Sequence, residues 1–598
     1  MYHIGVLLTG PWWHDLCYEC VELPPVGARV VVPVANGIRV GICTGVREKE
    51  ERIKTREVIR VLDDFPVVSA EYLAASERVS KAFLCSQSEV LRSLLPSIFW
   101  KGGPFERFCE AKRDKNAPAL EFLYSYSDLE RSDRYREEIL SCDGGVICLF
   151  SEGSSAALFR SSLKGVIPSE RLVSWPNVGG KTAWRAWNKA LSCENAVVIG
   201  APFAAAAPLK NPSLIIIDEE CSPSYRTRAY PCFSLRSFAV ARGRASVARV
   251  IMGGRMPSSR AFAKARLDGG GMPREKAYTD RIVSLNGIPK IPFRGIKFPL
   301  AMSDAVISET LSHVSGGETV FWLLDRRGET SCLKCGDCGR EVLCQCGHSM
   351  VLERGKLRCM TCGKTTSFPE RCPSCGGYLI EGTRPGLEAL LPLAERLLRG
   401  APVFLWHQDS PSKASEKKSV IKTLNERGGL VIGSRCALSL LDCVKPALLC
   451  WLDADAESRQ PSYRSKSNAY SMFLESCCRG GSKRDVIFQT RNPSGICIKS
   501  VSAGWRRFWE EELNERAELG FPPLSYMAEI TLPNGWADSA VLSEELADAG
   551  FTPLASAESA DTFTVLMPHI APLRRVLQKY FEINRSRNGF PSIRVYID

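Results

Sequence analysis

The sequence predicts an α/β protein with two lobes, each holding a mainly parallel β-sheet. At 598 residues the chain is too long for a single hydrophobic core. Short apolar runs recur at long intervals, and continuous rather than alternating runs indicate strands buried on both faces. The first series is GGVICLF, NAVVIG, LIIID and ARVIMGG, starting at residues 144, 195, 214 and 248, and the second is TVFWLLD, APVFLW, GLVIG and PALLCWLD, starting at residues 319, 401, 429 and 446.

The two ends of the chain have other patterns. The first hundred residues predict a β-rich unit, in which GARVVVPV and RVGICTGV are strands. Near the other end, WRRFWEEELNERAEL predicts a helix that Gly520 terminates. One face of that helix carries Trp505, Phe508, Trp509 and Leu513.

Composition limits the functions that the chain can have. Seventy-eight basic and 66 acidic residues give a net charge of +12, which permits contacts with nucleic-acid phosphates without requiring them. The apolar runs are too short to span a membrane. The start, MYHIGVLLTGPWW, has no basic region of the kind that opens a secretory signal. The sequence therefore predicts a cytoplasmic protein with no membrane partner.

Cysteine is concentrated in one segment. Of 25 cysteines, nine lie between Cys332 and Cys375. In a chain with no export signal such a cluster indicates metal ligands rather than disulfides. A C-x-x-C turn presents two thiolates to one zinc ion, and zinc takes four ligands in a tetrahedron. The segment therefore predicts two structural Cys₄ zinc sites, built from Cys335, Cys338, Cys344, Cys346, Cys359, Cys362, Cys372 and Cys375.

Two details of this segment stay open. Cys344 and Cys346 are separated by one residue, so the fourth ligand of their site is either Cys346 or His348. Cys332 is left over. Because the apolar periodicity stops here, we expect no core beyond the one that the metal supplies.

Residues 180–182, Gly-Lys-Thr, end like the phosphate-binding pattern G-x-x-x-x-G-K-[ST]. The position of the first glycine is occupied by Trp175, whose bulk would keep the backbone from closing on a phosphate. We interpret this match as accidental and expect a surface segment here.

Five segments together resemble the primosomal protein N′ (PriA) family of replication-restart DNA helicases, over nearly the whole chain. They are FWLLDRRG from residue 321, the cysteine array, GTRPGLEAL from 382, LDADAES from 452 and FWEEELNERAELGFPP from 508. In addition, LIIIDEECSPSY from 214 resembles the Walker B segment of the family, and VVIGAPFAAAAPL from 197 resembles the motif before it.

The resemblance implies two RecA-like lobes of a superfamily 2 helicase and an N-terminal domain that captures the 3′ end of a strand. Asp15 falls where the family has an aspartate in that domain's pocket. By family pairing, Cys335, Cys338, Cys372 and Cys375 hold one zinc ion and the other four cysteines hold the second. The implied partners are forked or single-stranded DNA, single-strand-binding protein, and the replicative helicase or its loader.

The resemblance also divides the chain. The expected parts are a β-rich 3′-end DNA-binding-like domain (1–100), a basic linker (101–121), lobe 1 (122–267), a linker and the start of lobe 2 (268–331), the zinc insertion (332–377), lobe 2 (378–500) and an α+β C-terminal domain (501–598). The linker is too short for the winged-helix domain that the family usually carries. It either touches DNA phosphates or is simply solvated.

The phosphate loop departs from the family pattern. By the resemblance it falls on YSYSDLERS, residues 124–132. Ser125, Asp128 and Glu130 stand where the family has glycines, which provide unusual dihedrals and a close backbone approach. Arg131 and Ser132 replace the lysine and threonine. Two carboxylates beside a triphosphate add repulsion, so ATP binding is doubtful.

Other nucleotide motifs are altered as well. The family's Ser-Ala-Thr-Pro is Gly-Arg-Met-Pro at 254–257, and GSRCALSLLD from 433 lacks the usual lysine-glycine pair. ESCCRGGS from 475 keeps one arginine, Arg479, and has Ser482 in place of the second. Cys221 replaces a histidine.

Two functions from different classes follow. The altered motifs favour a family member without ATPase activity, which binds forked DNA and helps reload the replicative helicase. The alternative is an active ATP-dependent 3′–5′ DNA helicase with a divergent phosphate loop, using Mg²⁺ on Asp218 and Glu219 and Arg479 as an arginine finger. A nucleic-acid-binding zinc protein of an unrelated process would leave the matches outside the cysteine segment unexplained.

For DNA contact we predict Arg326 and Arg327. These adjacent guanidiniums follow a buried strand and precede the cysteine segment. The alternative role is a structural salt bridge to the other lobe.

Overall fold

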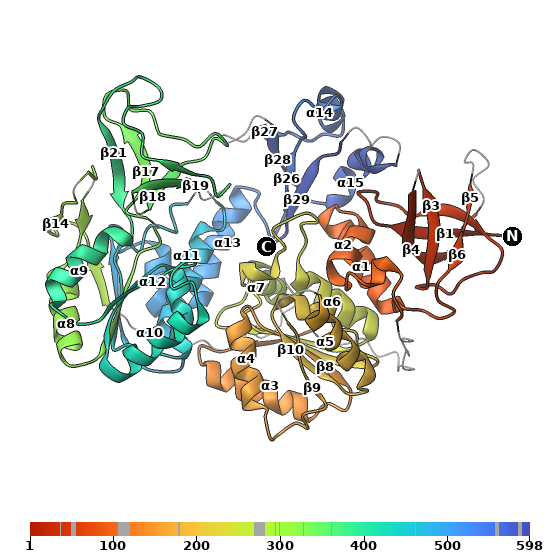
Figure 1. Cartoon of the computed structure of the whole chain (residues 1–598), viewed down its shortest axis with the longest axis horizontal. Helices are drawn as coiled ribbons and strands as arrows, with labels where there is room; N and C mark the ends of the chain where they lie inside the picture. The colour runs from red at the N-terminus through yellow and green to blue at the C-terminus, as the bar shows by residue number, and fades with distance from the viewer. Residues whose placement is uncertain are drawn as a thin grey trace. The chain divides into compact units, whose positions relative to one another are not determined.

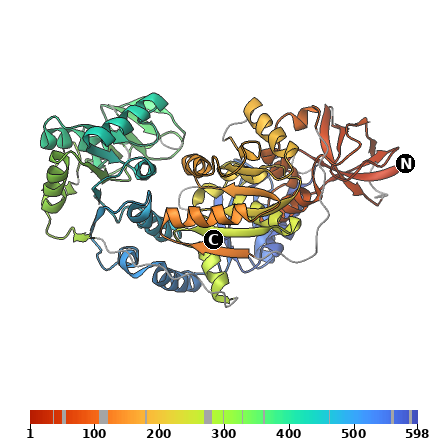
Figure 2. The same cartoon turned by 90° about the horizontal axis from the view of Figure 1, so that it is seen from below.

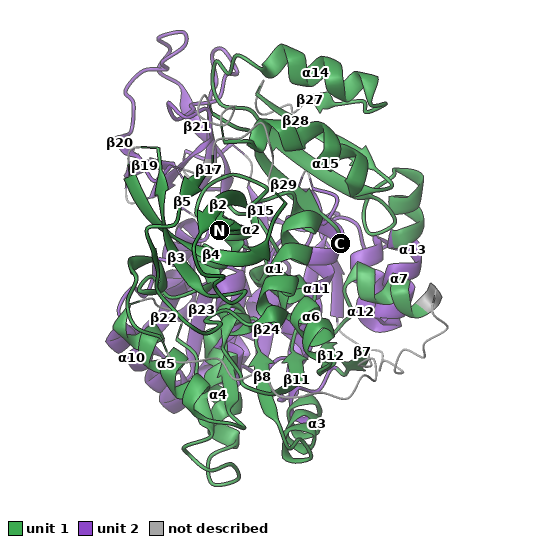
Figure 3. Ribbon diagram, turned by 90° about the vertical axis from the view of Figure 1, so that its right-hand side faces the viewer, with its two compact units in different colours: residues 1–125, 130–273, 513–598 green, residues 126–129, 274–512 purple. Residues whose placement is uncertain are grey.

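The structure is a computed structural model in which two compact units are distinguished (Figure 3). Unit 1 is Met1–Ser125, Glu130–Pro273 and Leu513–Asp598, and unit 2 is Tyr126–Leu129 and Arg274–Glu512. Among the described residues, no helix is both long and apolar enough to cross a bilayer. The described residues are 1–35, 37–48, 55–105, 120–176, 180–267, 281–293, 295–297, 299–326, 328–353, 355–359, 362–460, 462–555, 561–583 and 589–598.

The N-terminal region forms a six-stranded sheet in the order β5-β2-β1-β4-β3-β6. The two strands expected from GARVVVPV and RVGICTGV are confirmed as β3 and β4. Inward-facing Ile4, Val6 and Val30 are fully buried in its core. The strands are β1 (Tyr2–Leu8), β2 (Leu16–Cys20), β3 (Arg29–Val34), β4 (Gly37–Val46), β5 (Arg56–Glu57) and β6 (Arg60–Val61).

Two helices that we did not expect follow this sheet, α1 (Ala70–Phe83) and α2 (Gln87–Leu94) (Figure 1). The hydroxyl of Ser69 caps α1 by accepting from the N–H of Tyr72. Helix α1 packs on lobe 1, where the buried Glu71 carboxylate accepts from Arg242 Nε at 3.0 Å. The red N-terminal strands lie to one side of the orange and yellow lobe in both Figure 1 and Figure 2.

Lobe 1 is built on a six-stranded parallel sheet in the order β7-β12-β11-β8-β10-β9. The four apolar runs of the first series are confirmed as strands; β7 and β9 had no such signal. The strands are β7 (Leu120–Tyr124), β8 (Gly145–Leu149), β9 (Leu172–Ser174), β10 (Val197–Gly200), β11 (Pro212–Ile217) and β12 (Arg249–Gly254). The helices are α3 (Asp128–Leu140), α4 (Gly153–Ser162), α5 (Lys181–Ser192), α6 (Leu235–Ser246) and α7 (Ser259–Leu267).

Lobe 2 repeats this topology with a parallel sheet in the order β13-β25-β24-β16-β23-β22. Numbered along each lobe, both sheets follow the order 1-6-5-2-4-3. The second series of apolar runs is confirmed as strands. The strands are β13 (Arg281–Ser284), β16 (Thr319–Leu323), β22 (Val403–Trp406), β23 (Gly429–Gly433), β24 (Leu448–Trp451) and β25 (Asp485–Thr490). The helices are α8 (Asp304–Ser315), α9 (Leu391–Leu398), α10 (Ala414–Arg427), α11 (Ser465–Cys478) and α12 (Ile496–Ala503), and β14 (Lys290–Ile291) pairs with β15 (Leu300–Ala301).

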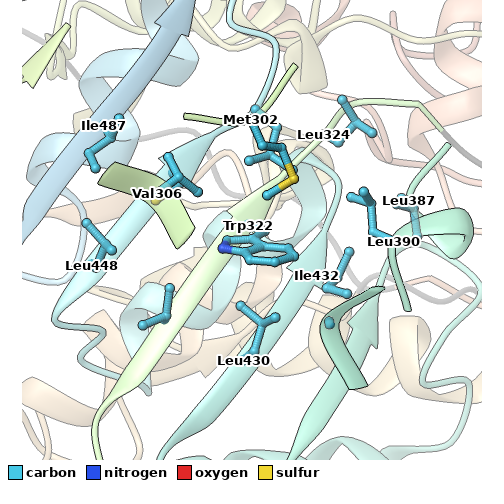
Figure 4. Close-up of a cluster of buried hydrophobic side chains, with 14 of the residues drawn as sticks. Met302, Val306, Trp322, Leu324, Leu387, Leu390, Leu430, Ile432, Leu448 and Ile487 are labelled. Carbon is cyan, nitrogen blue, oxygen red and sulfur yellow. The ribbon is translucent and has the colours of Figure 1, made fainter. Parts of the chain in front are cut away.

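The core of lobe 2 gathers around Trp322 of β16, which is fully buried (Figure 4). Its indole Nε1 donates to Thr310 Oγ1 of α8 at 2.9 Å, so the one polar atom of the side chain is satisfied. Leu430 and Ile432 of the neighbouring strand β23 pack in the same cluster. The core thus joins β16 to the helices that cover the sheet.

The cysteine-rich insertion forms its own five-stranded antiparallel sheet, in the order β20-β19-β18-β17-β21. The expectation that it has no core besides metal is wrong, because Leu333, Val342, Met350 and Leu357 are buried together with two of the cysteines. The strands are β17 (Thr330–Cys335), β18 (Met350–Glu353), β19 (Lys356–Cys359), β20 (Thr365–Ser367) and β21 (Ile380–Pro385).

The C-terminal part begins with α13 (Trp505–Glu518), and the predicted apolar face is confirmed. Trp505, Phe508, Trp509 and Leu513 are all less than 5 % exposed. A small antiparallel sheet in the order β27-β28-β26-β29 follows. Its elements are β26 (Tyr526–Thr531), α14 (Ser539–Asp548), β27 (Leu554–Ala555), β28 (Thr562–Met567), α15 (Ile570–Gln578) and β29 (Ser592–Tyr596).

Candidate functional site

Three consecutive carboxylates, Asp218, Glu219 and Glu220, follow β11 at the carboxyl edge of the lobe 1 sheet. Strand β11 lies between β12 and β8 in the sheet. Ligands of parallel sheets usually bind at the edge formed by the carboxyl ends of the strands. Asp218 and Glu220 are buried. Burial of acidic side chains is costly unless they are paired, which makes their partners decisive for the chemistry of the site.

Arg131 of α3 is the partner of the first two carboxylates. Its Nε lies 3.1 Å from Asp218 Oδ1, and its Nη2 lies 2.8 Å from Glu219 Oε1. The third nitrogen, Nη1, donates to the carbonyl of Ser125 at 2.5 Å. The side chain is only 3 % exposed. The Arg131 guanidinium therefore fills the space between Ser125 and the acidic pair.

Other side chains complete this cluster. Tyr135 donates its hydroxyl to Asp218 Oδ1 at 3.0 Å, and Arg255 of the altered Gly-Arg-Met-Pro segment donates to Glu219 Oε1 at 2.9 Å. Burial raises the pKa of Tyr135 well above its ordinary value, and the charge of Asp218 raises it further. Tyr135 therefore stays a neutral donor.

Glu220 has a separate set of partners. Tyr124 donates to its Oε1 at 3.0 Å, and Arg236 Nη1 donates to its Oε2 at 2.6 Å. Arg236 also pairs with Asp598. Burial alone would lower the pKa of Arg236, but Asp598 and Glu220 outweigh it and raise the pKa above the ordinary value. The acidic triplet is thus neutralised by side chains of the same unit.

The segment at the phosphate-loop position is short. Strand β7 ends at Tyr124 and α3 begins at Asp128, so Glu130, Arg131 and Ser132 are already helical. Both donors of Ser125 have partners. Its N–H donates to the carbonyl of Gly254 at 3.1 Å, and its hydroxyl donates to Glu130 Oε2 at 2.6 Å. A glycine-rich loop that cradles phosphate needs backbone N–H groups that point at the ligand.

The Gly-Lys-Thr segment lies elsewhere. Residues 177–179 are outside the described residues, while Lys181 and Thr182 are exposed at the start of α5. This helix follows β9 at the far edge of the sheet from β7. Trp175 packs closely over Gly200, since a Cβ on that glycine would lie 2.7 Å from the Trp175 Cβ.

Arg479, the candidate arginine finger, is paired inside lobe 2. Its Nε and Nη2 contact the two carboxylate oxygens of Asp442 at 2.9 and 2.6 Å. A bidentate pair of this kind holds the guanidinium in place, and the side chain is 4 % exposed. No pattern in the sequence indicated Asp442 as the partner.

Arg326, whose side chain is 12 % exposed, is also held in an ion pair, with its Nη2 at 2.5 Å from Asp453 Oδ2. Burial lowers its pKa; Asp453 opposes this, while Arg384, Arg491 and Arg459 add to the lowering. Arg327 lies outside the described residues. The alternative to DNA contact was a salt bridge from Arg326 to the other lobe. The partner, Asp453, instead belongs to the same lobe as Arg326.

Two arginines that the sequence analysis missed lie on the same carboxylate. Arg459 and Arg491 contact Asp453 Oδ1 at 3.1 and 3.2 Å, and their side chains are 42 % and 45 % exposed. They follow β24 and β25 at the carboxyl edge of the lobe 2 sheet. Arg491 also lies 3.8 Å from Asp455 Oδ2, so three guanidiniums face two carboxylates, and two of the three reach solvent.

Asp15 lies in the N-terminal sheet against Gly5, which leaves room for its carboxylate. Thr44 donates to Asp15, as does Arg47, whose Nε is 3.2 Å from Oδ2. The Asp15 side chain is 7 % exposed. The carboxylate is therefore held by neighbouring strands.

The eight cysteines gather into the two groups expected from the family pairing. Within each group the Sγ atoms lie within 4.8 Å of one another; the groups are Cys335, Cys338, Cys372 and Cys375, and Cys344, Cys346, Cys359 and Cys362. Neighbouring sulfurs are 3.4 to 3.8 Å apart. Sulfurs bound at about 2.3 Å to one zinc ion in a tetrahedron are separated by about 3.8 Å. Both thiol sets therefore fit a tetrahedral metal ion.

His348 is outside both groups. Its Nδ1 lies 3.0 Å from the carbonyl oxygen of Cys346, whereas Cys346 Sγ lies 3.4 Å from Cys359 Sγ. Of the two candidates that the sequence left open, Cys346 and not His348 thus lies with the other three thiols of the second group.

Each cysteine pair is followed by a glycine that closes the turn. Their φ angles are +72° to +82°, in the left-handed region that favours glycine, and the residues are Gly339, Gly347, Gly363 and Gly376. Each glycine N–H donates at 2.9 Å to the carbonyl of the first cysteine in its pair. The shorter Cys344-x-Cys346 pair closes in the same way with one residue fewer. In all four pairs the glycine directly follows the second cysteine, so this turn could have been predicted from the sequence.

Two parallel sheets of identical strand order, with an acidic strand end on the first, define a protein of the RecA-like, two-lobed helicase class. Residues 5–96 match the model of the PriA 3′ DNA-binding domain. The chain is 26 % identical over 459 residues to the replication restart protein PriA of Bacillus subtilis, and 25 % identical over 405 residues to that of Thermotoga maritima. These matches support a member of the PriA family.

The matches cover 74 % and 66 % of this chain, but the chain spans only about half of each relative, 56 % and 54 %. Among solved structures, Saccharomyces cerevisiae Dbp5 bound to RNA and ADP BeF3 has a TM-score of 0.35 at 10 % identity, covering 67 % of this chain and 90 % of that one. RecG bound to a three-way DNA junction has a TM-score of 0.34 at 11 % identity, covering 67 % and 43 %. The strand order, not these superpositions, defines the lobes.

The thiol geometry predicts two bound metal ions per chain. Replacing Cys346 by serine should reduce the content to about one ion, because the second group loses a thiolate. The matched change His348→Ala, two residues away, should leave two ions. Elemental analysis of the purified variants measures both. Equal loss in the two variants would contradict the assignment of Cys346.

The Arg131 cluster predicts a large effect on stability. Arg131→Ala leaves Asp218 and Glu219 without their shared counter-charge, and breaking a buried pair in this way costs about 3–5 kcal/mol. Arg134→Ala on the same helix removes an exposed arginine, 3.7 Å from Glu137, and should cost less than about 1 kcal/mol. Urea unfolding of both variants gives the comparison. Similar midpoints would show that Arg131 does not neutralise the carboxylates.

Proposed function

We propose that this protein is a replication-restart protein of the PriA family that binds forked DNA without hydrolysing ATP. The observation that carries the proposal is the Arg131 guanidinium between Asp218 and Glu219. Mg²⁺ held by these carboxylates would lie against a fixed positive charge 3.1 and 2.8 Å from their oxygens. The residues do not fit Mg²⁺·ATP.

The remaining requirements for phosphoryl transfer are unmet in the same way. Transfer needs positioned backbone donors, a metal ion and a free arginine finger. The Ser125 N–H is hydrogen-bonded to Gly254, and Arg479 is held by Asp442. The Ser125 N–H and the Arg479 guanidinium are therefore already engaged.

The cysteine-rich insertion would hold two zinc ions in a structural role. Four thiolates per ion leave no open position for water or substrate, so the metal would not take part in catalysis. Metal binding would instead stabilise the small sheet of β17 to β21, whose apolar core is only a few side chains.

DNA binding is supported by the match to the 3′ DNA-binding domain and by the arginine cluster of lobe 2. Half-exposed guanidiniums are suited to phosphate contacts, which position a protein on DNA without reading its sequence. Arg459 and Arg491 fit this role better than Arg326, which is much less exposed. In the same proposal, single-strand-binding protein and the replicative helicase or its loader are the protein partners, and the cytoplasm is the location.

The first test is ATP hydrolysis by the purified, metal-loaded chain, with and without forked DNA. We expect no turnover above that of the Asp218→Asn variant, and tighter binding of forked than of linear duplex DNA. Binding without turnover would support a protein that marks forks.

Two results would contradict this. DNA-stimulated turnover that Asp218→Asn abolishes would establish the alternative, an active 3′–5′ helicase with a divergent phosphate loop. Equal affinity for forked and linear duplex DNA would remove the proposed role at forks, whatever the ATPase result.

The arginine cluster predicts how DNA affinity depends on salt. Arg459→Glu combined with Arg491→Glu should weaken binding uniformly and reduce the slope of log K against log salt by about 2, one unit for each lost phosphate contact. The matched control is Lys422→Glu with Arg427→Glu, because these exposed residues on α10 lie away from the carboxyl edge. Fluorescence anisotropy over a salt series measures both slopes. Equal slopes in the two double variants would refute the assignment.

A further inference from the structure

The cysteine-rich insertion is attached to lobe 2 where the chain enters it and leaves it, within unit 2. The two crossings are hydrogen-bonded to each other: the Gly386 N–H donates to the carbonyl of Glu329 at 3.0 Å, and the Glu388 N–H donates to that of Gly328 at 3.3 Å. Glu388 opens the short helix η4 (Glu388–Leu390), which follows β21. The Glu388 side chain therefore lies at this junction.

The hairpin of β18 and β19 contacts lobe 2 as well. Arg358 of β19 lies 3.1 Å from Oδ2 of Asp409, which follows β22. Arg358 also lies 3.6 Å from Glu353 Oε2 of β18, so two carboxylates engage it. In the turn of the hairpin, the Gly355 N–H donates to Glu329 Oε1 at 3.4 Å. The insertion and lobe 2 thus meet through charged side chains.

Acidic groups dominate the surroundings of Glu388. Burial raises its pKa from 4.5 to about 7; the charges of Glu353 and Glu329 add to this, and backbone N–H groups oppose it. The facing group that can compensate its charge is His407, whose Nε2 lies 3.5 Å from Glu388 Oε1. The other basic group, Arg358, is engaged as described above. An ionised Glu388 would therefore face two like charges.

Two carboxylate oxygens of this cluster have no hydrogen-bond donor among the described residues. They are Glu388 Oε2 and Glu353 Oε1, and both are buried. A charged carboxylate that is removed from water is costly unless donors surround it, whereas a protonated carboxyl carries no charge and is itself a donor. The arrangement therefore favours the neutral form of Glu388.

We propose that the proton on Glu388 stabilises the attachment of the insertion to lobe 2, and that its loss weakens this attachment. Glu353 belongs to the insertion and Glu329 directly precedes β17, so repulsion from ionised Glu388 acts across the junction. Because the pKa is raised in the folded state, the attachment loses stability as pH rises from 4.5 through about 7. Neither DNA nor ATP is needed for this change, so it is independent of the proposed function.

The test is hydrogen exchange of the metal-loaded full chain, measured in peptides that cover β18 and β19 and corrected for the intrinsic rate at each pH. Protection should fall about ten-fold between pH 6 and pH 8, the change that proton linkage gives for a pKa raised from 4.5 to about 7. In Glu388→Gln, which is neutral at every pH, this fall should disappear. The matched control is Glu395→Gln on α9, which removes an exposed carboxylate of the same lobe and should leave the fall unchanged.

Glu353→Gln provides a second variant that leaves Glu388 in place. It removes one of the charges that raise the pKa of Glu388, so the fall in protection should move to lower pH. An equal fall in the wild type and in Glu388→Gln would assign the pH dependence to other groups, such as the cysteine thiols, and would overturn the inference. Protection that does not change with pH in the wild type, or an unmoved fall in Glu353→Gln, would overturn it as well.

Discussion

The buried ion pairs of Arg131 with Asp218 and Glu219 are the interaction on which lobe 1 depends. Adjacent carboxylates at a strand end need a positive charge nearby, since buried acids are costly without one. Here that charge is the Arg131 side chain of the same lobe, so the two carboxylates are neutralised without a bound ligand. Tyr135 and Arg255 then find their partners in the same cluster. A site of this composition holds the edge of the sheet together.

The same principle operates at the edge of lobe 2. Asp442 holds Arg479, and Asp453 holds Arg326, so arginines with little exposure are matched by acids with little exposure. Arg459 and Arg491, which both contact Asp453, are half exposed, so positive charge reaches solvent there. The distribution of paired and unmatched charge therefore separates residues that stabilise the lobes from those available to phosphate.

The small domains are stabilised by other means. The cysteine-rich insertion combines thiol groups of tetrahedral spacing with a core of a few apolar side chains. The N-terminal region is attached to lobe 1 by Glu71 and Arg242, and its Trp13 stacks on Phe581 of the C-terminal part at 4.3 Å. Segments far apart in sequence thus build one unit.

Features encoded by neighbouring residues were determined by the sequence itself. The eight apolar strands, the apolar face of α13 and the cysteine pairs follow from local periodicity and spacing. Short or half-buried strands such as β7 and β9 lacked that signal, and the core of the insertion was missed because its apolar residues are scattered. Only the tertiary structure decided which charges meet: Arg131 and Asp218 are 87 residues apart in the chain, and Arg326 and Asp453 are 127 apart. Their pairing depends on which strand ends the topology brings together, and no local pattern carries that information.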